Sequence, residues 1–196
     1  MLALFTETAK QIGDGQQYDI EFETRDNVAE EEYLEMIRLK TSVLLAASLR
    51  LGGILAGASD ADQEALYAYG EKMGLAFQLQ DDLLDVYADQ SLFGKKIGGD
   101  ICCNKKTFLL ITALNLASPE QFAEMKQWMA KKDFDEQEKI KFFTDMYDKL
   151  GVREICEKRI ESLFAMCDEY IERISVPDDK KANLKAFANS LLNRKV

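Results

Sequence analysis

Residues 77–85 read Phe77-Gln78-Leu79-Gln80-Asp81-Asp82-Leu83-Leu84-Asp85, which places three carboxylates inside an apolar run. At helical spacing, Gln78 and the three aspartates fall on one face of a helix. Like charges three and four residues apart repel each other, and partial burial would raise the pKa values of these carboxyls. A divalent cation would neutralise that charge, and Mg²⁺ prefers oxygen ligands. We therefore predict that Asp81, Asp82 and Asp85 bind Mg²⁺.

Two motifs that contain lysine follow the aspartates along the chain. They read Gly94-Lys95-Lys96-Ile97-Gly98-Gly99-Asp100 and then Asn104-Lys105-Lys106-Thr107. Mg²⁺ is normally shared with substrate phosphates, so carboxylates on one side and ammonium groups on the other suit a diphosphate. Alone, Lys95 and Lys105 would be ordinary surface lysines, but their position after the aspartates favours contacts with phosphate.

Apolar residues recur at helical spacing throughout the chain, with no persistent strand pattern, internal repeat or domain boundary. Gly13 and Gly15 are expected to end a first helix, and an acidic connection over residues 19–27 follows. A cap at Asp60 would open the helix that carries the aspartates. The expected helices span about residues 2–13, 28–55, 60–88, 104–116, 118–130, 134–150, 152–174 and 177–192.

The composition excludes several kinds of protein. A net charge of −10 with dispersed lysines argues against nucleic acid as a partner. The chain has no histidine and its four cysteines form no Cys-x-x-Cys motif, which disfavours a zinc site and hydrolases that need an imidazole base, and we expect reduced thiols. Neither a run of about 18 apolar residues nor a signal peptide is found. A cytoplasmic protein without a transmembrane segment is therefore expected.

The aspartate and lysine motifs together resemble the second aspartate-rich region of the trans-polyprenyl diphosphate synthases, which make farnesyl, geranylgeranyl and longer prenyl diphosphates. A bare Asp-Asp-x-x-Asp is common by chance, but here Phe-Gln-x-Gln precedes it and both lysine motifs follow at the family's spacing. Two upstream matches are Gly15-Gln16-x-x-Asp19 and Lys40-Thr41. All of these matches belong to the C-terminal part of the proteins in this family.

This resemblance implies an all-α, isoprenoid-synthase-type helical bundle with its N-terminal helices missing. Residues 1–196 would form the C-terminal part of a single polyprenyl synthetase domain. The implied activity is prenyl transfer, in which an allylic prenyl diphosphate condenses with isopentenyl diphosphate in a Mg²⁺-dependent reaction. A homodimer is also implied.

The resemblance further implies roles for individual residues. Lys40 would lie near the allylic diphosphate, and its carbonyl, the Thr41 hydroxyl and the Gln78 amide would face the carbocation. Lys95 and Lys105 would bind diphosphate, and Asp100 would orient one of these lysines. The remaining matches, Gln16 and Asp19, would line the cavity opposite the first aspartate-rich motif of the family.

That first motif, and the basic residues that hold the second substrate, are not found in the sequence. Met1 opens directly on an apparent helix interior without a cap, so we expect a truncated chain whose incomplete site is inactive alone. Two alternatives stay open. One is a non-catalytic partner subunit that resembles a prenyl synthase, and the other is a terpene cyclase of the same fold.

Overall fold

A computed structural model of the protein describes residues 1–88 and 97–192. These residues form helices and no strand, which confirms the all-α prediction. The elements are α1 (Leu2–Thr24), α2 (Glu30–Ile37), the π-helical turn η1 (Arg38–Ser42), α3 (Val43–Leu55), α4 (Asp60–Tyr87), α6 (Gly99–Cys102), α7 (Phe108–Leu116), α8 (Pro119–Ala130), α9 (Glu136–Lys149), α10 (Val152–Glu172) and α11 (Asp178–Leu192).

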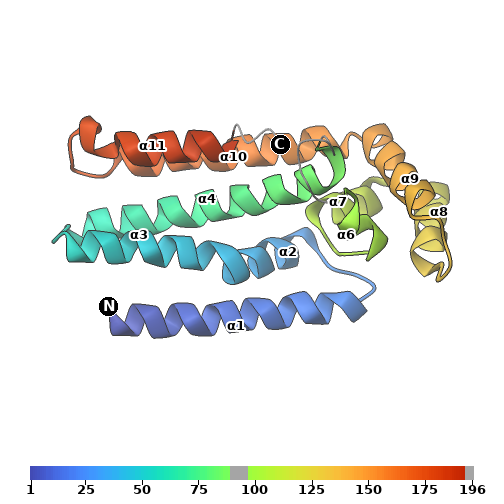
Figure 1. The fold of residues 1–196 in the computed structure, drawn as a ribbon, viewed down its shortest axis with the longest axis horizontal. Coiled ribbons are helices and arrows are strands. Elements are labelled where there is room, and N and C mark those ends of the chain that lie inside the picture. Colours follow the sequence, from blue (N-terminus) through green and yellow to red (C-terminus); the bar gives the residue numbers. More distant parts are fainter. Residues whose placement is uncertain (89–96, 193–196) are drawn as a thin grey trace.

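Helix α4 lies at the centre of the molecule. It packs against α3 on one side and α10 on the other, while α1 packs against η1. The long helices run side by side along the molecule, and α8 and α9 lie together at one end (Figure 1). Since α4 has neighbours on several sides, its aspartate-bearing end is held among α2, α6 and α7. None of the described helices is long and apolar enough to cross a membrane.

Helix α1 is longer than the sequence predicted. It continues through Gly13 and Gly15 to Thr24, so the residues expected to form an acidic connection are mostly helical. The reason is a contact with another helix: a Cβ on Gly15 would lie 2.4 Å from the Lys40 backbone nitrogen. Gly15 therefore permits a close approach of two backbones, which is a different use of glycine from ending a helix.

The chain makes a π-helical turn where α2 passes into α3. The turn η1 contains Lys40 and Thr41, and its bonding includes a hydrogen bond from the Val43 N–H to the Arg38 carbonyl. Glycines of two other helices lie against this turn. Gly15 of α1 contacts its backbone at Lys40, and a Cβ on Gly74 of α4 would stand 2.6 Å from the Ser42 Cα. Such single π turns often mark functional sites.

Side-chain caps define where several helices begin. The N-cap of α4 is Ser59, whose hydroxyl accepts a hydrogen bond from the Asp62 N–H, so the cap lies one residue before the predicted Asp60. Ser118 and Gln121 form a capping box at the start of α8, with proline at the first helical position. The Thr107 hydroxyl caps α7, which fixes the end of the second lysine motif.

Candidate active site

The three aspartates of α4 do not share one environment. Asp81 and Asp85 are four residues apart and each is partly exposed, whereas Asp82 is only 2% exposed. Successive residues of a helix point about 100° apart, so a single face cannot carry both Asp81 and Asp82 outward. The structure therefore corrects the expectation of a shared face: Asp82 is turned into the protein.

The carboxylate of Asp82 joins three helices. It accepts hydrogen bonds from the Tyr33 hydroxyl of α2 and, at 3.4 Å, from the Phe108 N–H at the start of α7. Burial raises the pKa of Asp82 to about 7, against the lowering effect of the Tyr33 hydrogen bond. Asp82 thus ties α4 to α2 and α7 beneath the exposed aspartates.

The raised pKa of Asp82 should make the folded state less stable as the pH rises. An unfolded aspartate titrates near about 3.9, so between about pH 4 and about pH 7 the folded state holds a proton that the unfolded state has released. The contribution is present below this window and lost through it, at up to about 1.4 kcal/mol per pH unit. Urea denaturation at both ends of this pH window should show a smaller decrease in the free energy of unfolding for Asp82→Asn than for the unsubstituted protein. Equal decreases in the two proteins would contradict this assignment.

Asp85 holds the segment that enters α6. Its side chain accepts a hydrogen bond from the Asp100 N–H at 3.0 Å, and its carbonyl accepts one from the Gly98 N–H at 2.6 Å. Burial raises the pKa of Asp85, opposed by the hydrogen bond from Asp100. The end of the first lysine motif is thereby anchored to the same helix that carries the aspartates.

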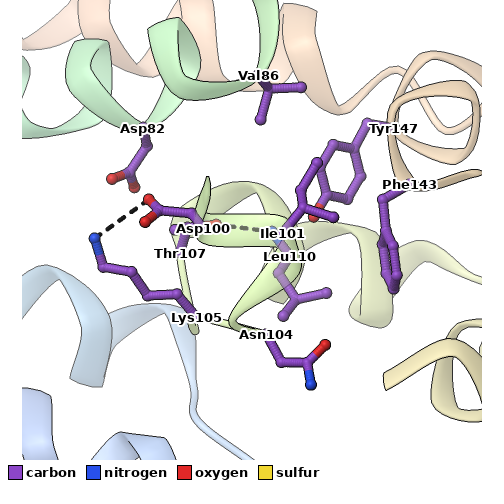
Figure 2. A pocket seen from close by; sticks show the side chains of 10 residues that line it. All are labelled: Asp82, Val86, Asp100, Ile101, Asn104, Lys105, Thr107, Leu110, Phe143 and Tyr147. Atoms are coloured by element: carbon purple, nitrogen blue, oxygen red, sulfur yellow. Dashed lines mark hydrogen bonds and ion pairs between the residues drawn. The ribbon is translucent and has the colours of Figure 1, made fainter. Parts of the chain in front are cut away.

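Lys105 lies next to two carboxylates. Its Nζ forms an ion pair with the Asp100 carboxylate at 3.2 Å, and Figure 2 shows the Asp82 carboxylate next to this ion pair. Burial lowers the pKa of Lys105, but the negative charges of Asp100 and Asp82 outweigh that effect and raise it above its usual value. Lys105 therefore stays protonated and could meet a phosphate.

The residues predicted from the upstream motifs meet across a small cavity. The Lys40 Nζ lies 2.6 Å from the Asp19 carboxylate, and the Thr41 hydroxyl donates to the Gln78 amide oxygen at 3.3 Å. Asp19, Lys40, Gln78 and Lys105 line the same cavity. A neighbouring cavity of about 530 Å³ also includes Asp19, Asp100 and Lys105 in its lining.

Two predicted residues are not part of this arrangement. Gln16 lies exposed on α1, one turn before Asp19, and lines neither of these cavities. Lys95 lies outside the described residues, so its predicted contact with diphosphate stays a prediction.

Sequence reasoning overlooked two polar residues that support the site. Tyr33 carries no signal of its own in the sequence, because its bond to Asp82 spans 49 positions that no local pattern connects. Lys139 was not singled out, although it lies four residues before Phe143 and seven before Met146 on the buried stripe of α9. A lysine on an apolar stripe was the signal that could have found it.

Among the described residues, no group of three histidine, cysteine, aspartate or glutamate side chains is arranged to hold a metal ion. What the structure brings together is two lysines, Lys40 and Lys105, each paired with a carboxylate, and Asp85, which accepts a hydrogen bond from the Asp100 N–H. Asp81 is partly exposed one turn before Asp85 on α4. This arrangement can bind an anion together with a cation that is shared with it.

Comparison with known proteins agrees with this fold. The structure has the all-α isoprenoid synthase fold: it matches the crystal structure of a geranylgeranyl pyrophosphate synthase with a TM-score of 0.91 and 39% identity over 99% of this chain. Residues 1–147 match the family model of polyprenyl synthetases. The chain belongs to the polyprenyl synthetase family, as the resemblance of its motifs predicted.

Individual relatives are longer than this chain. The short chain isoprenyl diphosphate synthase of Methanothermobacter thermautotrophicus is 33% identical over 193 residues, covering 98% of this chain and 58% of that protein. The geranylgeranyl pyrophosphate synthase from Corynebacterium glutamicum, solved in complex with isoprenyl diphosphate and magnesium, matches with a TM-score of 0.88 and 33% identity over 98% of this chain and 54% of that one. The chain therefore spans little more than half the length of these relatives.

Proposed function

We propose that this chain provides one wall of a trans-prenyltransferase site, which condenses an allylic prenyl diphosphate with isopentenyl diphosphate. The observation that carries the proposal is the convergence on one cavity region of Lys40 and Lys105 with their carboxylate partners Asp19 and Asp100. Polyprenyl synthetases supply the reaction class, and the geometry here supplies cations for a diphosphate.

Mg²⁺ fits this site as a shared ion. Mg²⁺ is usually bound by one or two carboxylates together with substrate phosphates, and Asp81 and Asp85 are two partly exposed carboxylates one turn apart on α4. We propose Asp81 and Asp85 as the ligands of Mg²⁺. Asp82 would hold α4 in place through its hydrogen bonds with the Tyr33 hydroxyl and the Phe108 N–H. When bound, Mg²⁺ would neutralise the negative charge of the departing diphosphate.

The chain's own residues would hold and orient the substrate. Lys40 and Lys105 would bind diphosphate oxygens by charge-assisted hydrogen bonds, each kept in place by its carboxylate. The Thr41 hydroxyl donates a hydrogen bond to the Gln78 amide oxygen, which holds these two oxygens side by side. Their partial negative charges would stabilise an allylic cation. With no histidine in the chain, we propose that the departing diphosphate takes up the proton that is released after condensation.

Mg²⁺ and inorganic pyrophosphate should bind to this protein cooperatively. Each ion neutralises the charge that the other brings, so each should raise the affinity of the other by about 10-fold or more. Calorimetric titration measures this coupling, and Asp81→Ala should remove most of it. Asp60→Ala, which replaces an exposed aspartate in the first turn of the same helix, is the matched control and should leave this coupling unchanged. Equal Mg²⁺ affinity with and without pyrophosphate would exclude the proposed site.

Several finer features remain proposals. The family match favours prenyl transfer over terpene cyclisation, while a non-catalytic partner subunit would bind Mg²⁺ and pyrophosphate without forming product. We also propose that residues 1–196 belong to a single domain, that the protein is cytoplasmic, that it acts as a homodimer, and that these 196 residues alone turn over poorly.

A further inference from the structure

One lysine is fully buried beside the turn that precedes Lys105. Lys139 of α9 has no exposed surface, and its Nζ donates to the Cys102 carbonyl at 3.1 Å and to the Asn104 Oδ1 at 2.7 Å. The ammonium group also lies 4.2 Å from the centre of the Phe134 ring. Burial lowers the pKa of Lys139. In the described part of the chain, no carboxylate forms an ion pair with it.

These contacts secure an uncommon backbone conformation. Asn104 has a φ of +54° and is the one non-glycine residue with positive φ among those described. Its amide group is held from two helices, since Oδ1 accepts from Lys139 of α9 and Nδ2 donates to the Met129 carbonyl of α8 at 2.9 Å. A residue in the left-handed region persists where its surroundings fix it. Here the surroundings include a buried cation.

The next residue along the chain is Lys105. Its backbone N–H donates to the Asp100 carbonyl at 3.0 Å, and its side chain pairs with the carboxylate of the same aspartate. Figure 2 shows the side chains of Asn104 and Lys105 leaving this turn in different directions. The turn is therefore tied to α4 through Asp85 at its start and to α9 through Lys139 at its end.

A structural filler at this position would not need a charge. Burying an ammonium group without a carboxylate partner is unfavourable, and a methionine of similar length could fill the space. What the lysine adds is a donor that reaches two oxygens of the turn at once. Resting on the proposed function, we infer that Lys139 is a positioning residue, which holds the Asn104 turn so that Lys105 points at the diphosphate.

The test is a double-mutant cycle between Lys139 and Lys105, read as the affinity for inorganic pyrophosphate in the presence of Mg²⁺. Lys105→Ala should raise the pyrophosphate Kd by about 10-fold, because it removes a charge-assisted contact. Lys139→Met should raise it by a similar factor, although Lys139 touches no ligand. In the Lys139→Met background, Lys105→Ala should then cost less than about 3-fold, since the lysine is already misplaced.

Two further variants separate positioning from folding. Lys141→Met changes a lysine of the same helix whose side chain is 75% exposed, and it should leave the Kd unchanged. Lys139→Gln keeps a neutral donor and should restore part of the affinity. If Lys139→Met does not fold, Asn104→Gly replaces it in the cycle, because glycine adopts positive φ freely while removing the Oδ1 acceptor.

The outcomes distinguish the inference from the function on which it rests. An unchanged pyrophosphate Kd in folded Lys139→Met, or full effects of both substitutions in the double variant, would overturn the positioning role alone. An unchanged Kd in Lys105→Ala would instead contradict the proposed diphosphate site. Failure of both Lys139→Met and Asn104→Gly to fold would assign this contact to stability, and would also overturn the inference.

Discussion

Gly15→Ala is expected to lower the free energy of unfolding by about 2–3 kcal/mol, although alanine is ordinarily the better helix former. An added Cβ would lie 2.4 Å from the Lys40 backbone nitrogen and 2.8 Å from the Leu39 carbonyl carbon. Backbone atoms cannot rotate away as the end of a side chain can, so α1 and η1 must separate. Urea denaturation measures the loss.

Gly13→Ala provides a matched control on the same helix. A Cβ at Gly13 would have nothing within 4 Å, so this substitution should raise the free energy of unfolding by about 0.5–1 kcal/mol through helix propensity alone. The two glycines are two positions apart and their substitutions should have opposite signs. A stabilising Gly15→Ala would contradict the close packing of α1 against η1.

The same substitution should also affect the site. The η1 turn carries Lys40, whose ion pair with Asp19 of α1 crosses the contact that Gly15 makes. Moving η1 away from α1 would lengthen that pair, and pyrophosphate binding should weaken together with stability. Gly15 thus explains one of the upstream motifs physically: the glycine permits the approach, and Asp19 one turn later meets the lysine.

The sequence predicted the helices well where the information is local. Apolar spacing, the Ser118 cap and the length of the aspartate-bearing helix all come from residues within a few turns of each other. The second lysine motif could also be placed near the aspartates from the sequence, because its residues follow them shortly along the chain.

What the sequence could not supply was contact between distant elements. Gly15 has the same local signature whether it ends a helix or touches another backbone, and only the position of Lys40 decides. Asp82 is chemically equal to Asp81, yet Tyr33 and the start of α7 take it out of the exposed face. Helical spacing groups residues by angle, but it does not say which neighbouring helix covers each side.

A protein made of these 196 residues alone is expected to show turnover at least about 100-fold below that of a full-length relative. The sequence contains one Asp-Asp-x-x-Asp motif, in which Asp81 and Asp85 are partly exposed and Asp82 is buried. Carboxylates for a second wall around the diphosphate are thus not evident. Because catalysis of this kind depends on preorganised charge, and loss of even one oxyanion donor costs about 10²–10³ in rate, the deficit should be large.

The measurement is condensation of labelled isopentenyl diphosphate with an allylic diphosphate in the presence of Mg²⁺. The short chain isoprenyl diphosphate synthase of Methanothermobacter thermautotrophicus serves as the reference, assayed at the same molar concentration. Pyrophosphate binding should persist while product formation is nearly absent, because Lys40 and Lys105 are present in the chain. Turnover comparable to the reference would contradict this expectation and require other metal ligands. Glu23 would be the first to substitute, since it lies exposed on α1 and lines the same cavity as Asp19 and Lys105.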